Sequence, residues 1–224
     1  MTDSRQQRIN MVESQVRPSD VTDRRIQRAM LDVPREAFVP EEMRPLAYMD
    51  GAVPVTDAGP GGAARRALLA PRTFAKLVQL AEIEPDAVVL DVGCATGYSV
   101  AVLARLAKAV VGVEADAALA ARAAANLRAL GVANAIIIEG PLQAGAPAHA
   151  PFDAILLEGA VADVPQDLIG QLKSGGRLVA IVAEDSFGRA QVWRRSGKIS
   201  DRSPAFDAGA PPLPGFGRQA QFSL

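Results

Sequence analysis

The stretch from Val88 to Tyr98, VVLDVGCATGY, constrains the fold of this chain more than any other. Its apolar start, Val88 to Leu90, predicts a short buried strand, and a helix is expected from Tyr98. Between them, Gly93 and Gly97 let the backbone approach a ligand closely, and the helix start offers free N–H groups. The stretch therefore predicts a nucleotide-type binding turn or, as the alternative, a strand, turn and helix without a ligand.

The spacing of the turn and one carboxylate indicate which ligand it would bind. The pattern is Gly93-x-Ala95-x-Gly97 rather than the G-x-G-x-x-G of dinucleotide sites. Asp91 precedes the first glycine by two positions, where it would repel an anionic pyrophosphate. A ligand with an amino group and a sulfonium cation suits such a carboxylate. We therefore predict S-adenosyl-L-methionine, with its amino group held by Asp91 directly or through water.

Composition restricts the kinds of site that the chain can build. The 224 residues carry a net charge of −1, so neither nucleic acid nor a membrane is an expected partner. The single cysteine, Cys94, excludes an internal disulfide and a cysteine-based zinc site, and no metal site is predicted. The single histidine, His149, leaves few options for a Ser-His-Asp site. Because no apolar run approaches roughly 20 residues and no signal peptide is recognisable, a cytoplasmic protein is expected.

Two regions are expected along the chain. Residues 1–72 form an N-terminal helical segment with a substrate loop, and residues 73–224 form the ligand-binding domain. The Gly/Pro-rich stretch 51–71 is a candidate lid or substrate loop, or else a plain connector. Helical patterns occupy residues 6–16, 41–46 and 71–81. A further helix is expected between the first two, capped by Asp20 or Thr22 and stopped at Val33-Pro34.

From residue 86 onward, strand and helix patterns alternate. This order predicts a doubly wound α/β fold with a mostly parallel sheet, because parallel strands need crossover connections. The expected strands are 88–90, 109–113, 135–138, 154–157 and 177–182, and the expected helices are 98–106, 116–130 and 165–172. Asp116 is expected to cap the second helix and Gly131 to close it. Edge strands are predicted at 191–194 and 218–222, with a mobile loop at 203–217 between them.

Five further residues carry groups with possible chemical roles. Glu114 ends the second strand, where doubly wound folds place an acid that accepts hydrogen bonds from ribose hydroxyls. Cys94 is interpreted as a small filler of the turn, although a helix start could lower its pKa and make it a nucleophile. His149 lies in a proline-flanked loop and the pair Glu184-Asp185 follows a strand, and both are interpreted as solvated groups.

Motifs spread in order over residues 25 to 182 resemble protein-L-isoaspartate O-methyltransferases. The most specific are VPREAFVP at 33–40 and Ala-Tyr-x-Asp at 47–50. The others are VLDVG and the following Gly-Tyr at 89–98, AVLA at 101–104, APFDAI at 150–155, Val-Pro at 164–165, and QLKSGGRLV at 171–179. The glycine motif alone would indicate only a class I methyltransferase with a Rossmann-like fold.

The resemblance implies an activity and a partner. The family transfers methyl from S-adenosyl-L-methionine to the carboxylate of isoaspartyl residues in damaged proteins, so a protein or peptide substrate is expected. A carboxylate is already an anionic nucleophile at neutral pH, so no general base is required. The implied cofactor-binding residues are Asp91, Gly93, Cys94, Ala95, Gly97, Tyr98, Glu114, Ala115, Gly140, Pro141, Leu142 and Glu158, with Arg65, Arg66 and Leu69 as substrate-loop candidates.

Three positions depart from the family pattern. The family's substrate loop carries Thr-Ile-Ser-x-Pro, whose Ser contacts the substrate carboxyl, and here Leu69 stands at the Ser position. The family's Gly-Asp-Gly near the adenine is Gly140-Pro141-Leu142 here, and Ala95 stands where a third glycine could be. Two alternatives to isoaspartyl methylation follow from these departures: methylation of a different substrate, and a non-catalytic protein of the same fold that binds a partner.

Overall fold

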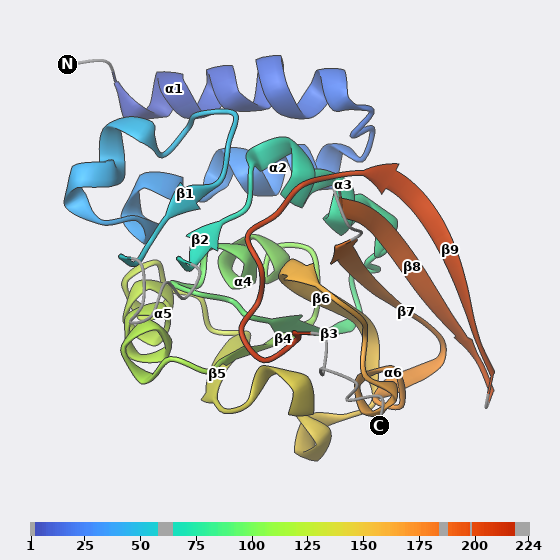
Figure 1. Ribbon diagram of the computed structural model, residues 1–224. Helices are drawn as coiled ribbons and strands as arrows, with labels where there is room; N and C mark the ends of the chain where they lie inside the picture. Colours follow the sequence, from blue (N-terminus) through green and yellow to red (C-terminus); the bar gives the residue numbers. More distant parts are fainter. Residues whose placement is uncertain (1–2, 58–64, 184–187, 198, 218–224) are drawn as a thin grey trace, which may run out of the picture.

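A seven-stranded sheet in the order β5-β4-β3-β6-β7-β8-β9 forms the centre of the molecule (Figure 1). The computed structural model describes residues 3–57, 65–183, 188–197 and 199–217. The strands from β5 to β7 run parallel, and β8 and β9 are antiparallel to their neighbours, as the predicted fold class requires. Their bounds are β3 Val88–Val92, β4 Ala109–Glu114, β5 Ala135–Glu139, β6 Phe152–Val161, β7 Leu172–Ala183, β8 Gly188–Ser196 and β9 Ile199–Asp207.

Alternate residues of the central strands enter two apolar clusters, one on each face of the sheet. Val89 belongs to the cluster that the larger helices cover, and the adjacent Leu90 belongs to the other. The helices are α1 Ser4–Met11, α2 Arg24–Asp32, α3 Pro71–Leu80, α4 Tyr98–Leu103, α5 Ala117–Ala129 and α6 Gln166–Ile169. The second face is covered by the short α6, by Leu142, and by Leu213 and Phe216 from the end of the described chain. None of the described helices has the length and apolarity that a membrane span needs.

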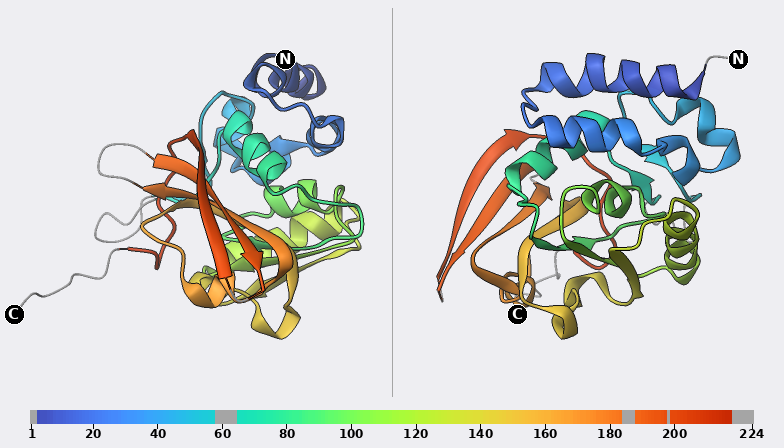
Figure 2. Two further views of the ribbon diagram at one scale, coloured as in Figure 1. Left: turned by 90° about the vertical axis from the view of Figure 1, so that its right-hand side faces the viewer. Right: turned by 180° about the vertical axis from the view of Figure 1, so that it is seen from behind.

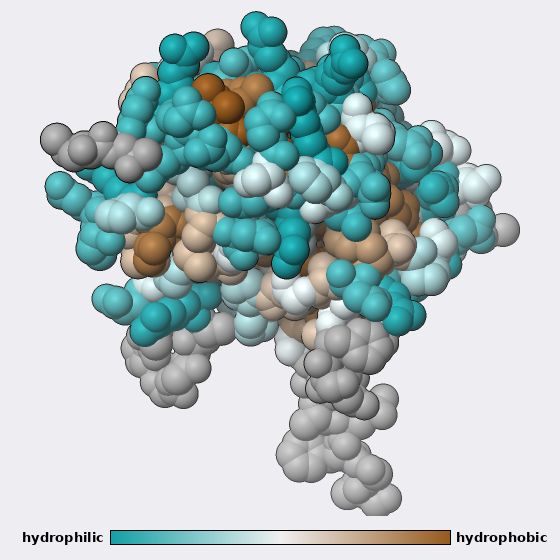
Figure 3. Space-filling model, turned by 90° about the horizontal axis from the view of Figure 1, so that it is seen from above, coloured by the Kyte–Doolittle hydropathy of each residue, from teal (hydrophilic) through white to brown (hydrophobic). Residues whose placement is uncertain are grey.

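The N-terminal residues form an outer helical layer over α3 and α4. Figure 2 shows α1 and α2 lying side by side above the rest of the fold. α1 continues into a π-helical turn, Val12–Val16. The two elements together match the predicted helix at 6–16. The predicted caps of α2 are wrong: Asp20 has a left-handed backbone, and Asp23 caps the helix by accepting the Arg25 N–H. From above, the surface is mostly hydrophilic with small, separate apolar patches (Figure 3).

The expected loop at 51–71 contains a small antiparallel hairpin. β1 Val53–Pro54 pairs with β2 Ala67–Leu68. The Arg66 carbonyl accepts the Val55 N–H at 2.8 Å, which extends the ladder toward the tip. The α3 helix follows with Pro71 in its first turn, as predicted.

The C-terminal prediction is partly wrong. β8 confirms the expected strand at 191–194, but β9 occupies the beginning of the expected loop at 203–217, and residues 218–222 lie outside the described part of the chain. β9 is an edge strand, where Pro204 removes no essential ladder bond. Residues 211–216 then cross back to β6: the Ala160 N–H donates to the Pro211 carbonyl at 2.8 Å, and the Leu213 N–H donates to the Ala160 carbonyl at 2.8 Å (Figure 1).

Two helices are shorter than predicted. α4 ends at Leu103 rather than 106, because the next residues turn more tightly and the Leu106 N–H bonds the Leu103 carbonyl at 2.9 Å. α6 spans only Gln166–Ile169. The Gln171 carbonyl accepts the Phe152 N–H at 2.8 Å, which draws the chain into the sheet before the predicted helix end at 172.

The predicted cap of α5 provides a test of local stability. Asp116 Oδ1 accepts the N–H groups of Ala118 and Leu119 at 2.8 and 3.0 Å, and Gly131 follows the helix with a φ of 67°. Replacing Asp116 with Ala leaves these N–H groups without the side-chain acceptor. We expect the free energy of unfolding in urea to fall by about 1 kcal/mol. Asp57→Ala, at an exposed position, is the control, and an equal loss in both variants would contradict the capping role.

Candidate active site

The predicted binding turn joins β3 to α4 at the carboxyl end of the parallel strands. Gly93 and Gly97 have φ angles of 82° and 92°, which glycine adopts without strain. Ala95 is buried and also has a positive φ, 49°, despite its side chain. A Cβ on Gly97 would lie 3.1 Å from the Cβ of Ala123, so this glycine allows α5 to pack against the turn. The turn therefore lies where the sequence places it.

Glu114, the predicted ribose-binding acid, ends β4 and its side chain reaches this turn. Its side chain is fully buried. The Ala95 N–H donates to Oε2 at 2.7 Å, and the Ala115 and Asp116 N–H groups donate to Oε1 at 2.9 and 3.2 Å. Three backbone donors thus fix the carboxylate against the turn.

The guanidinium of Arg66 completes the set of donors around Glu114. Nη1 donates to Oε1 at 3.1 Å and Nη2 to Oε2 at 2.9 Å, a two-pronged ion pair that is buried. Nη2 also donates to the Gly93 carbonyl at 2.8 Å. The family resemblance predicts that Arg65 or Arg66 contacts the substrate carboxylate. In the structure Arg65 is exposed, whereas Arg66 is directed at the predicted cofactor site.

Two other acids in the site have buried oxygens without partners. Neither carboxylate oxygen of Asp91, nor Oε1 of Glu158, accepts a hydrogen bond from the part of the chain that is described. Burial raises the pKa of Asp91 to about 7, with Glu114 adding to the rise, while Ser99 and Arg66 oppose it. Burial, and then Asp91, raise the pKa of Glu158 well above its usual range. Unpaired buried acids of this kind favour a cationic ligand.

The space beside these residues is too small for S-adenosyl-L-methionine. The cavity between the turn and the substrate loop has a volume of about 10 Å³, near that of one water probe, whereas small-ligand pockets measure roughly 300–1,000 Å³. Leu213 and Arg66 occupy the hollow over Gly93: a Cβ there would lie 2.7 Å from Leu213 Cδ2 and 3.3 Å from Arg66 Nη2. The charge of the acids suits the cofactor's cationic end. The volume of the site, however, cannot hold the cofactor while Arg66 and Leu213 occupy the hollow.

The substrate-loop position Leu69 is buried and lines the same small cavity. Its carbonyl accepts a hydrogen bond from Nη2 of Arg35 at 2.7 Å, and Nε of Arg35 donates to the Ala47 carbonyl at 2.7 Å. Arg35, which also lies over the Tyr98 ring at 4.7 Å, therefore connects the N-terminal segment to the loop. An apolar, buried Leu69 gives a substrate carboxyl no side-chain donor.

The segment after β5, whose residues 140–142 are predicted to bind the cofactor, lies beside Glu114. The Gly140 N–H donates to the Glu114 backbone carbonyl at 3.0 Å. Pro141 is exposed, and Leu142 is buried in the apolar cluster that contains Leu213 and Phe216. Leu142 thus belongs to the apolar packing on the second face of the sheet, and Pro141, at the position of the family's acid, faces solvent.

The remaining candidate residues that the structure describes are either packed in the interior or exposed to solvent. Burial, followed by Asp91, raises the pKa of the Cys94 thiol well above its usual range, which agrees with its interpretation as a filler. Tyr98 is buried against Phe38, with ring centroids 5.6 Å apart. His149 is exposed, and Glu184-Asp185 lie outside the described residues.

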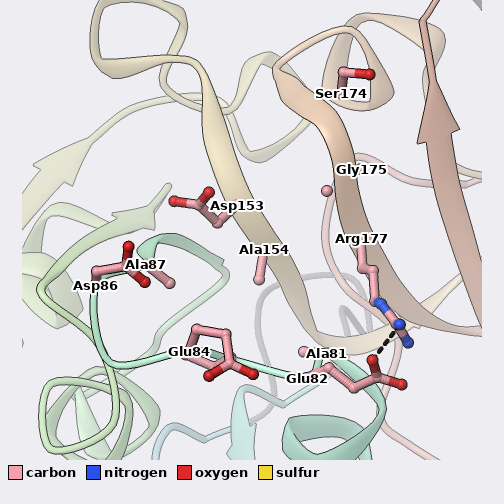
Figure 4. A pocket seen from close by; sticks show the side chains of 12 residues that line it. Ala81, Glu82, Glu84, Asp86, Ala87, Asp153, Ala154, Ser174, Gly175 and Arg177 are labelled. Carbon is pink, nitrogen blue, oxygen red and sulfur yellow. Dashed lines mark ion pairs between the residues drawn. The ribbon is translucent and has the colours of Figure 1, made fainter.

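A separate hollow of about 270 Å³ lies at the opposite ends of the strands (Figure 4). Glu82, Glu84, Asp86 and Asp153 line it, and Glu82 pairs with Arg177. Ligands of open parallel sheets bind at the carboxyl ends of strands, whereas this hollow lies where β3 and β6 begin. It is therefore distinct from the candidate active site.

Comparison with known proteins identifies the family. A sequence model of the protein-L-isoaspartate(D-aspartate) O-methyltransferase family matches residues 6–206. The chain belongs to this family. It is 34% identical over 212 residues to a protein-L-isoaspartate O-methyltransferase of Herpetosiphon aurantiacus, covering 95% of this chain and 92% of the relative. It is 39% identical over 195 residues to protein-L-isoaspartate O-methyltransferase 1 of Rhodopseudomonas palustris, covering 87% and 77%.

Solved structures agree on the fold. A protein-L-isoaspartate O-methyltransferase superposes with a TM-score of 0.82 at 24% identity, covering 93% of this chain and 66% of that chain. A protein described as the Plasmodium falciparum member, in complex with S-adenosyl-L-homocysteine, gives a TM-score of 0.77 at 20% identity, covering 92% and 97%. The comparisons confirm the predicted family, the class I methyltransferase fold, the methyltransferase class and S-adenosyl-L-methionine as the family's cofactor.

The raised pKa of Asp91 predicts a pH-dependent stability difference. The folded-state pKa, about 7, exceeds the unfolded value near 4, so this carboxyl destabilises the fold progressively as pH rises from about 4 to 7. Asn at this position cannot ionise. We therefore expect the stability of Asp91→Asn relative to the unsubstituted protein to grow by about 2–3 kcal/mol between pH 5 and pH 8, measured by urea unfolding. A difference that stays constant over this range would contradict the buried, unpaired state of Asp91.

Proposed function

We propose that this chain is a methyltransferase that esterifies the free carboxylate of isoaspartyl residues in proteins. The family match over residues 6–206 is the observation that carries the proposal. The substrate carboxylate is ionised at neutral pH, so the reaction requires an aligned nucleophile rather than a general base. Cys94 and His149 agree with this, since the thiol is buried with a raised pKa and the imidazole is exposed.

In this proposal the cofactor lies over the turn between β3 and α4. Gly93 and Gly97 allow the backbone to approach it, and Asp91 and Glu158 face its cationic end. Glu114 lies where ribose hydroxyls would be held. The hairpin of β1 and β2 and the following Leu69 border the same cavity, so the acceptor would enter from that side.

The filled hollow favours a second candidate, a binding protein of the same fold that transfers no methyl group. Arg66 and Leu213 occupy the space over Gly93, and a protein that never bound the cofactor could retain this packing permanently. The two candidates differ in whether a methyl group reaches any acceptor.

Methyl transfer to peptides tests the proposal. We expect labelled methyl from S-adenosyl-L-methionine to appear on a peptide with one isoaspartyl residue and not on the same peptide with a normal aspartyl residue. Asp91→Asn should lower the initial rate roughly tenfold or more, because the variant loses the anion that faces the cofactor's cation.

Each other outcome has a distinct meaning. Equal labelling of both peptides would overturn the substrate assignment. Labelling of neither peptide, together with tight binding of S-adenosyl-L-homocysteine in a calorimeter, would indicate a different acceptor. Labelling of neither peptide and no binding would favour the non-catalytic candidate.

A further inference from the structure

Arg66 occupies the hydrogen-bonding positions of Glu114 that a ligand would use. A carboxylate offers about four lone pairs. Arg66 supplies two donors and the backbone of Ala95, Ala115 and Asp116 supplies three, so Glu114 accepts five hydrogen bonds. No lone pair remains for a ribose hydroxyl while Arg66 is in place.

Leu213 occupies the surface of the turn itself. A Cβ on Gly93 would lie 2.7 Å from Leu213 Cδ2, and a Cβ on Gly159 would lie 2.7 Å from Leu213 Cγ. Both glycines therefore accommodate this leucine, which is 4% exposed, and Phe216 beside it is 5% exposed. The glycine expected to let a cofactor approach the backbone is instead covered by a side chain of the same protein.

The two groups come from segments far apart in the sequence and meet over Gly93. Arg66 is carried by the β1–β2 hairpin, and Leu213 by residues 211–216. Both segments have less backbone pairing than the central strands. The hairpin has two paired positions per strand and one further hydrogen bond, from the Val55 N–H to the Arg66 carbonyl, and residues 211–216 are held to β6 and Ala162 by three backbone hydrogen bonds. Buried apolar side chains, among them Val53 and Leu213, also hold each segment in place. Segments with such short ladders open at lower free energy than the central strands.

We propose that Arg66 and Leu213 form an internal plug that closes the cofactor site and must leave before S-adenosyl-L-methionine can bind. This inference rests on the proposed function. Withdrawal of Arg66 frees the lone pairs of Glu114, and withdrawal of residues 211–216 uncovers Gly93. Because the apparent affinity of a ligand falls by the fraction of molecules that are open, the plug weakens cofactor binding.

Calorimetry with S-adenosyl-L-homocysteine tests the plug directly. We expect Arg66→Gln and Leu213→Ala each to bind roughly tenfold or more tightly than the unsubstituted protein, because each variant raises the open fraction. Arg177→Gln, which breaks an ion pair at the opposite ends of the strands, is the matched control for Arg66. Leu172→Ala, which truncates a buried leucine of the same apolar cluster, is the matched control for Leu213→Ala. Both control variants should bind S-adenosyl-L-homocysteine as tightly as the unsubstituted protein does.

The proposal fails if Arg66→Gln and Leu213→Ala bind no more tightly than the unsubstituted protein, including the case in which none of them binds. Isoaspartyl methylation by the unsubstituted protein alongside that result would overturn the plug and leave the proposed function intact. Circular dichroism of each variant establishes that it is folded before it is titrated.

Hydrogen–deuterium exchange of the unsubstituted protein gives a test without substitutions. The Ala160 and Leu213 N–H groups bond across the contact between β6 and residues 211–216. Saturating S-adenosyl-L-homocysteine should speed exchange at these two amides, because the ligand displaces the segment. Slower or unchanged exchange there, with ligand bound, would overturn the plug.

Discussion

The buried carboxylate of Glu114 sets the arrangement of everything around it. An ionised group that is fully buried requires hydrogen bonds and a counter-charge. Here the turn supplies hydrogen bonds, and Arg66 supplies hydrogen bonds and the positive charge. The β1–β2 hairpin of the candidate substrate loop is consequently tied to the end of β4. One salt bridge therefore connects the predicted cofactor site to the candidate substrate loop.

The two halves of the site differ in electrostatic balance. At the Glu114 end, every acceptor is engaged by the protein itself. At the other end, Asp91 and Glu158 are buried, and their oxygens without hydrogen-bond partners among the described residues are both oxygens of Asp91 and Oε1 of Glu158. Burial raises the pKa of both acids, Glu114 adds to the rise at Asp91, and Asp91 adds to the rise at Glu158. Arg66 lowers the pKa of both acids, so its withdrawal would leave three acids facing the hollow. A cationic ligand entering as Arg66 leaves would replace the lost positive charge.

Local pattern in the sequence is enough to predict the strand, turn and helix around Gly93, the place of Glu114 and the cap at Asp116, because each depends on residues a few positions apart. The partner of Glu114 is 48 positions away in sequence, and no periodicity or motif reports such a contact. The same limit applies to Leu213, whose proline-rich surroundings predict a mobile loop although Leu213 and Phe216 are buried there. The sequence does not predict edge strand β9 for a related reason, since its polar residues and Pro204 lack the alternation of a half-buried strand.

Two departures from the family pattern are buried apolar residues on opposite faces of the sheet. Leu69 lines the small cavity beside the turn, and Leu142 lies in the apolar cluster with Leu213 and Phe216. Apolar side chains at a polar ligand site would be costly if water or a nucleoside occupied it permanently, but they pack well against one another when the protein fills the space itself. Leu142 and residues 211–216 are therefore parts of one packing arrangement, and Leu69 belongs to the cluster on the other face. A single substitution at Leu69 or Leu142 would leave that packing largely closed, because neither residue lies over Gly93, where Arg66 and Leu213 meet.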